Sequence, residues 1–160
     1  MHTVELSKME IEHLNQIDVP IMEEMEAIYG PEISAGAIAR LPASRSYTLA
    51  VDGEVAAIGG LTEIYRGLAE AWLFSDRTIA ERVRKSFFKK ISDALDILAE
   101  GLGCHRVQAS AVVGDAQACR FLEHLGFSHE GIMRRYGPKR EDFFRYAKLY
   151  GDEEWLAEQE

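Results

Sequence analysis

Cysteine, leader segments and long apolar runs are scarce or missing in this sequence of 160 residues. The two cysteines, Cys104 and Cys119, follow no metal-binding spacing, so we expect a reducing compartment and two buried thiols. The N-terminus lacks the charged start and following apolar run that are typical of a signal peptide. No stretch approaches the ~20 apolar residues that span a bilayer. We therefore expect a soluble, cytoplasmic protein without a membrane partner.

Positive charge is also in short supply, because the formal net charge is −9. This balance disfavours bulk attraction to nucleic acid or to an anionic membrane. Basic residues nevertheless gather near the C-terminus, at Arg134, Arg135, Lys139 and Arg140. Two interpretations stay open for them: they recognise an acidic substrate, or they offset the acidic tail.

The composition predicts one globular domain over residues 1–160, with an acidic tail over residues 151–160. Apolar residues make up 47% of the chain and charged residues 28%, both ordinary for a globular protein. A chain of this size buries enough surface to fold without a disulfide or a metal. No repeat, low-complexity segment or linker divides it.

The first half of the sequence predicts a short strand, two helices and a three-stranded meander. Pro20 separates the two helices, and Asp52-Gly53 between apolar runs is a strong hairpin signal. The expected elements are a strand at 2–6, helices at 9–17 and 21–29, an irregular segment at 31–45, and strands at 47–51, 55–61 and 68–74.

The second half changes period. Apolar residues spaced four apart predict one continuous helix over 79–98, followed by an alternating strand over 107–113. A strand, a helix and a strand in this order imply a parallel pair. A helix capped by Asp115 and ended by Gly126, then strands at 127–136 and 143–150, complete the chain. The predicted fold is a mixed α/β sheet of six to seven strands with helices on both faces.

The segment that begins at Asp115 and ends at Gly126-Phe127 resembles the late helix of the GNAT superfamily of N-acetyltransferases. The usual form there is Asn-x-x-Ala-x-x-Phe-Tyr-x-x-x-Gly-Phe. Residues 130–134 and 146–149 look like the end of the branch that acetylates ribosomal-protein alanine, and phage-encoded members share a similar shortened layout. The resemblance is specific over residues 105–150 and rests on strand order before them.

This resemblance implies a fold, a co-substrate and a reaction. Members bind acetyl-CoA between the fourth and fifth strands, with the pyrophosphate at the start of the long helix, where unpaired N–H groups favour anions. A primary amine of a small molecule or a peptide attacks the thioester directly. Metal is not implied, and homodimers are common in the superfamily.

The resemblance also assigns roles to individual residues. Carboxylates on the third and fourth strands of the chain often act as the general base in this superfamily, which points to Glu70 first and to Glu63 second. Tyr136 and Tyr146 are candidate proton donors. Each of these four residues has a purely structural alternative. The candidates for binding acetyl-CoA are Trp72, Phe74, Ser75, Arg77, Thr78, Arg82 and Asp115.

Several positions depart from the superfamily pattern. The expected pyrophosphate loop, residues 75–82, contains no glycine, although arginine, serine and threonine side chains there offer other contacts. Leu122 replaces the usual tyrosine. Asp115 replaces the usual asparagine and is either a helix cap or a cofactor contact. A second hypothesis is therefore a fold relative without catalysis, such as a binding or structural protein in a phage particle.

Overall fold

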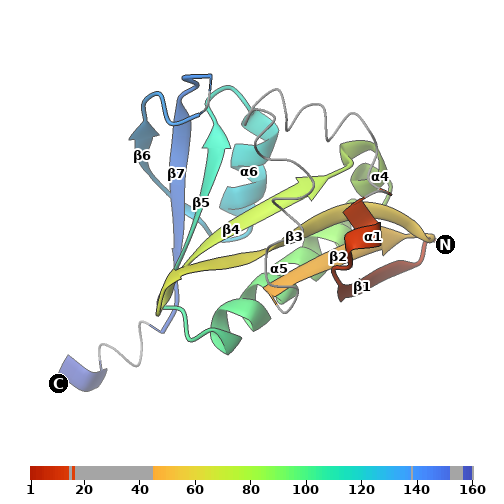
Figure 1. Cartoon of the computed structure of the whole chain (residues 1–160), viewed down its shortest axis with the longest axis horizontal. Coiled ribbons are helices and arrows are strands. Elements are labelled where there is room, and N and C mark those ends of the chain that lie inside the picture. The colour runs from red at the N-terminus through yellow and green to blue at the C-terminus, as the bar shows by residue number, and fades with distance from the viewer. Residues whose placement is uncertain (15, 17–44, 138, 152–156, 160) are drawn as a thin grey trace. The chain divides into compact units, whose positions relative to one another are not determined.

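The computed structural model describes residues 1–14, 16, 45–137, 139–151 and 157–159. Seven strands form one sheet in the order β1-β2-β3-β4-β5-β7-β6 (Figure 1). The mixed α/β sheet and its strand number confirm the predicted fold class. The helix predicted at 21–29, and the irregular segment up to residue 44, lie outside the described residues.

The described elements follow the predicted order closely. They are β1 (Val4–Lys8), α1 (Ile11–Leu14), β2 (Ser46–Val51), β3 (Glu54–Tyr65), β4 (Leu68–Ser75), α4 (Arg77–Arg82), α5 (Arg84–Gly101), β5 (Arg106–Val112), α6 (Ala116–His124), β6 (Ser128–Met133) and β7 (Phe143–Leu149). The chain divides into two compact units. Strands β3 and β4 and helix α5 each contribute residues to both.

The first unit comprises residues 1–60 and 72–95. Strand β1 pairs antiparallel with β2, and β2 pairs antiparallel with β3 across the predicted Asp52-Gly53 turn. The apolar residues Leu49, Val51 and Ile58 are almost fully buried here. The hairpin predicted at Asp52-Gly53 is therefore confirmed.

The long helix predicted over 79–98 is wrong in one respect, because it is divided into α4 and α5 at Val83. Val83 has φ −129° and ψ 34°, and its N–H donates to the Ala80 carbonyl, three residues back. A tight turn of this kind ends an α-helix. The Val83 carbonyl still accepts from the Phe87 N–H, so the apolar spacing runs through the break.

The second unit comprises residues 61–71 and 96–160, with β5 at its centre. Strand β5 pairs parallel with β4 over three residue pairs, which end at Glu70 and Gln108. On its other side β5 pairs antiparallel with β7, and β7 pairs with β6. The parallel pair predicted from the strand–helix–strand order is confirmed.

The two faces of this part of the sheet differ in chemistry. Val107, Ala109 and Ala111 on β5 are buried, and the hydroxyl of Tyr146, which lies opposite Ala109, donates to Glu123 on α6. Alternate residues point to opposite faces of a strand. The opposite face therefore carries the polar residues of β5: Arg106, Gln108 and Ser110.

Helix α6 has the predicted ends but not the predicted burial. The Asp115 carboxylate accepts from the Ala118 N–H at 3.1 Å, which confirms the predicted cap. Gly126 has φ 98°, a left-handed exit that glycine adopts without a steric penalty. Apolar spacing predicts a buried stripe on this helix, formed by Ala118, Phe121, Leu122 and Leu125. The first three residues are only half-buried, and Leu125, at the end of the helix, is buried.

The structure tests two expectations from the composition, the burial of both cysteines and the absence of a membrane-spanning segment. Cys104 is buried as predicted, but Cys119 is half-buried because it lies on the half-covered helix α6. None of the helices in the described part of the chain is long and apolar enough to cross a membrane.

Candidate functional site

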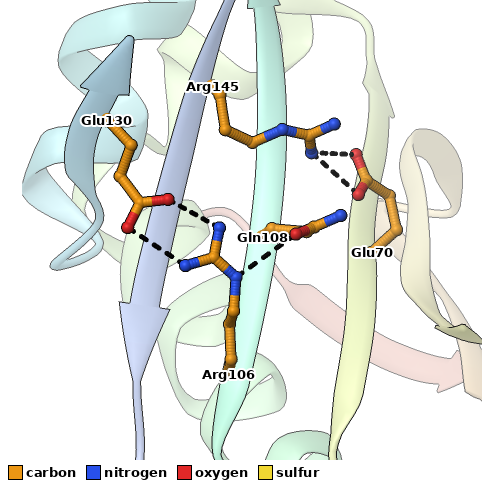
Figure 2. Close-up of polar contacts among 5 residues, drawn as sticks. All are labelled: Glu70, Arg106, Gln108, Glu130 and Arg145. Carbon is orange, nitrogen blue, oxygen red and sulfur yellow. Dashed lines mark hydrogen bonds and ion pairs between the residues drawn. The ribbon is translucent and has the colours of Figure 1, made fainter. Parts of the chain in front are cut away.

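A network of charged side chains covers the polar face of β4, β5, β7 and β6 (Figure 2). At its centre, Nη1 of Arg145 on β7 donates to both carboxylate oxygens of Glu70 on β4, at 2.9 Å each. The register explains this contact, since Arg145 lies opposite Ser110 and Glu70 lies beside Gln108 on the intervening strand. The side chains are mostly buried, with Glu70 27% and Arg145 17% exposed.

Ser110 and Tyr136 complete the surroundings of this pair. The Ser110 hydroxyl donates to Oε1 of Glu70 at 3.3 Å. The Arg145 guanidinium carbon lies 5.7 Å from the centre of the Tyr136 ring, which in turn contacts the edge of the Phe143 ring. A guanidinium next to an aromatic face is a favourable arrangement. We call Glu70, Ser110, Tyr136 and Arg145 the Glu70 cluster.

Tyr136 is held in place by the loop that joins β6 to β7. The Arg135 N–H donates to the Asp142 carboxylate at 2.9 Å, and the Gly137 N–H donates to the Glu141 carbonyl at 3.0 Å. These bonds flank Tyr136 on both sides. Its side chain nonetheless remains 51% exposed and accessible to a ligand.

A second ion pair joins β5 to the edge strand β6. Nη1 and Nη2 of Arg106 donate to the two oxygens of Glu130 at 3.0 and 2.6 Å, and Nε donates to Gln108. A β-bulge makes this contact possible, because Glu130 is the extra residue between His129 and Gly131. The hydrogen bonds from Arg106 lower the pKa of Glu130, and in return they raise the pKa of Arg106.

The structure brings together two of the three residues predicted to be catalytic. Glu70 and Tyr136 both contact Arg145. Glu63 lies half-buried on β3. The alternative proton donor Tyr146 lies on the opposite face of the sheet, 2% exposed, and burial raises its pKa. Tyr146 is therefore separated from the Glu70 cluster by the sheet itself.

Most residues predicted to bind acetyl-CoA belong to the first unit. Trp72 and Phe74 lie on β4, with ring centres 5.7 Å apart. The Nε1 atom of Trp72 is buried, and no residue in the described ranges accepts its hydrogen. A buried donor without an acceptor is rare in proteins and is a candidate contact for a ligand.

The start of α4 is occupied by an acid of the chain itself. The Asp76 carboxylate accepts from the N–H groups of Thr78 and Ile79, at 2.9 and 3.1 Å. The amides at the start of α4, where the sequence predicts the pyrophosphate, are thus already bonded to Asp76, next to a negative charge. Arg82, at the end of α4, lies 3.6 Å from Glu54, and both side chains are exposed.

The remaining predicted cofactor residues lie at the ends of strands and helices. Ser75 ends β4 and Arg77 begins α4, both in the first unit, whereas Asp115 caps α6 in the second. Within the described residues, no group of three or more His, Cys, Asp or Glu side chains is placed to hold a metal ion.

Sequence reasoning missed Arg145, the residue on which the Glu70 cluster is centred. Its partner lies 75 residues earlier in the chain, so no local pattern joins the two. The available signal was the polar residue at every second position of β5. It does not extend to β7, where Phe143 and Ala147 share the face of Arg145. The sequence therefore did not supply the register that pairs Arg145 with Glu70.

Comparisons with known proteins agree on the fold. No protein-family model and no curated protein sequence matches the chain. Among solved structures, a proposed phosphinothricin N-acetyltransferase is 19% identical, with a TM-score of 0.74 over 93% of this chain and 99% of the other. A ribosomal-protein alanine acetyltransferase from Vibrio fischeri is 12% identical, with a TM-score of 0.71 over 93% and 94%. A ribosomal-protein α-N-acetyltransferase solved with coenzyme A is 14% identical, with a TM-score of 0.69 over 92% and 94%. At these identities the likeness shows that the chain has the fold of GNAT acetyltransferases.

Proposed function

We propose that this protein is an acetyl-CoA-dependent N-acetyltransferase that acts on a primary amine. The fold supports the proposal, because the similar structures are named for acetyl transfer to a small molecule or to a ribosomal protein, and one of them holds coenzyme A. The observation that carries it is the fixed, partly exposed carboxylate of Glu70 beside Tyr136 and Arg145.

Glu70 is suited to orient an amine. Its Oε2 atom accepts one hydrogen bond in the structure, from Arg145, and a carboxylate oxygen has room for a second. An amine N–H bonded there is held by a group that does not rotate, because Arg145 and Ser110 fix the carboxylate. We assign Glu70 the role of accepting the proton that the amine loses.

The co-substrate supplies an acetyl thioester, and transfer forms a carbon–nitrogen bond as the carbon–sulfur bond breaks, so the amine loses a proton and the leaving sulfur gains one. Tyr136 is our candidate for the proton donor, because it is exposed and lies beside Arg145 within the Glu70 cluster. The adjacent guanidinium of Arg145 also favours the neutral, reactive form of a nearby amine.

We propose that the predicted cofactor residues bind acetyl-CoA through side chains and not through the backbone amides at the start of α4. The Nε1–H of Trp72, which has no acceptor among the described residues, suits a carbonyl or phosphate oxygen. Because Asp76 already uses the amides at the start of α4, we assign the phosphates to side chains instead of to the helix N-terminus. The candidates are Ser75, Arg77, Thr78 and Arg82.

The Asp76 cap also favours a second candidate function. A carboxylate at the expected pyrophosphate position, in a stretch without glycine, is what a fold relative that has lost acetyl-CoA binding would contain. In that case the chain would be a binding or structural protein. The Glu70 cluster would then be a structural ion pair on the sheet.

Thermal unfolding with acetyl-CoA distinguishes the two functions. A ligand that binds only the folded chain stabilises it by about 2.7 kcal/mol at a hundredfold excess over its dissociation constant. We expect such a shift for the native chain and for Glu70→Gln, together with acetyl transfer that slows by about 10²- to 10⁴-fold in the variant.

The matched variant is Glu63→Gln, which removes the other candidate base. Loss of transfer in Glu63→Gln but not in Glu70→Gln would move the base role to Glu63. The absence of any thermal shift at ~1 mM acetyl-CoA would contradict the enzyme and favour the binding protein.

A further inference from the structure

The guanidinium of Arg145 uses only one of its nitrogens for Glu70. Nη1 donates to both carboxylate oxygens, at 2.9 Å each. Nε and Nη2 make no hydrogen bond to any residue in the described ranges. Figure 2 shows dashed lines to Glu70 from one terminal nitrogen of Arg145 alone. This second edge is the planar fork that pairs with a carboxylate through two parallel hydrogen bonds.

Arg106, on the same face of the sheet, is an arginine whose side-chain nitrogens all donate hydrogen bonds. All three of its nitrogens are engaged, Nη1 and Nη2 with Glu130 and Nε with Gln108. The two arginines lie on neighbouring strands, β5 and β7, and each pairs with a glutamate. They differ in that Arg145 retains a fork for a further partner.

The surroundings of Arg145 make this fork suitable for binding. The side chain is 17% exposed, and within the described residues Nε and Nη2 are not among the buried atoms that lack a partner, so these donors are open to a ligand from solution. An anion that pairs with both gains two charge-assisted hydrogen bonds. Tyr136 packs beside the guanidinium and Glu70 holds its other edge, so little conformational freedom is left to lose on binding.

We infer that Arg145 binds an anionic group of the acceptor, and that the acceptor is a free amino acid or a similar small zwitterion. This inference rests on the proposed acetyl transfer. The amine of the acceptor lies at Glu70 and its carboxylate at the Nε–Nη2 edge of Arg145. A zwitterion matches a site in which one carboxylate and one guanidinium stand side by side and cancel in charge.

The same argument disfavours two other classes of acceptor. A protein N-terminus carries an uncharged peptide carbonyl next to its amine, and a lysine side chain or a polyamine carries no anion there. Each would leave the fork of Arg145 without the anion that it is shaped to pair with. A site that is built to bind a charged group rejects analogues that lack it.

The test offers the chain a mixture of the twenty free L-amino acids and the corresponding C-terminal amides, with acetyl-CoA. Mass spectrometry measures the N-acetylated products. Ligand-observed NMR without acetyl-CoA measures binding of the same compounds. We expect acids to be preferred over amides by about 10- to 100-fold in both measurements. Arg145→Gln should reduce this preference to about one, whereas the matched variant Arg106→Gln should retain it, because the Arg106 fork is already occupied.

The outcomes separate this inference from the proposed function. Equal acetylation of acids and amides would overturn the inference and leave the transferase intact. Preferred binding of acids without any transfer would support the amino-acid site and contradict the transferase. Neither binding nor transfer would overturn both. A preference for acids that persists in Arg145→Gln would also overturn the role of Arg145.

Discussion

Breaking the ion pair between Glu70 and Arg145 should destabilise the fold in a way that reveals how the two residues depend on each other. Nη1 of Arg145 contacts both carboxylate oxygens, and the side chains are 27% and 17% exposed. Removing one partner therefore leaves the other charge largely out of water. Fully buried pairs lose about 3–5 kcal/mol in this situation and exposed pairs less than about 1 kcal/mol.

Because the exposure of this pair is intermediate, the loss of unfolding free energy from each single substitution should lie between those limits. We expect Glu70→Gln and Arg145→Gln each to lower the free energy of unfolding by about 1–3 kcal/mol. The double substitution should cost less than the sum of the two, because no unpaired charge remains. The coupling energy from the double-mutant cycle should be about 1–2 kcal/mol.

Urea unfolding followed by circular dichroism measures all four proteins of the cycle. The matched control is the exposed pair of Arg82 and Glu54, which are 3.6 Å apart and 46% and 62% exposed. Its coupling energy should stay below about 0.5 kcal/mol. Equal coupling in the two cycles would refute the claim that burial and geometry make the Glu70 pair strong.

Three further predictions follow from other contacts. The pKa of the Glu130 carboxyl should lie below 4.5 in an NMR pH series, and Arg106→Gln should raise it. Because the folded-state pKa is lowered, the pair stabilises the fold above about pH 4.5. This stabilisation is lost as the pH falls through the folded-state pKa. Gly131→Ala should destabilise the chain by about 1–3 kcal/mol in thermal unfolding, because φ at this bulge is 147°, and an unchanged midpoint would contradict the bulge. Asp76→Asn should keep the helix cap, and with it stability to within about 0.5 kcal/mol, while calorimetry should show tighter acetyl-CoA binding after removal of a negative charge; weaker binding would count against placing the phosphates near α4.

Local patterns predicted the elements well, because their causes are local. The alternation on β5 and the glycine exit of α6 at Gly126 are each set by neighbouring residues, and both are confirmed. The break at Val83 was missed since the apolar stripe continues through it. Half-burial of α6 was missed since a stripe of apolar residues shows which face is covered but not how completely.

Register and bulges limited what the sequence could say about the site. A slip of one residue in the pairing of β5 with β7 would move Arg145 to the other face of the sheet. The bulge that directs Glu130 toward Arg106 depends on the whole β6–β7 hairpin. Glu70 and Tyr136 were named through a resemblance, whereas the arginine that joins them becomes visible only when the strands are paired.

Acetyl-CoA binding along β4 is the central claim, and the indole N–H signal of Trp72 tests it most directly. Trp72 is one of two tryptophans in the sequence, so comparison with Trp72→Phe assigns its signal in a ¹H–¹⁵N NMR spectrum. Its Nε1–H is buried without an acceptor in the described part of the chain. We predict that this signal shifts on titration with acetyl-CoA as the hydrogen gains a partner. An unchanged signal at ~1 mM acetyl-CoA would contradict the claim.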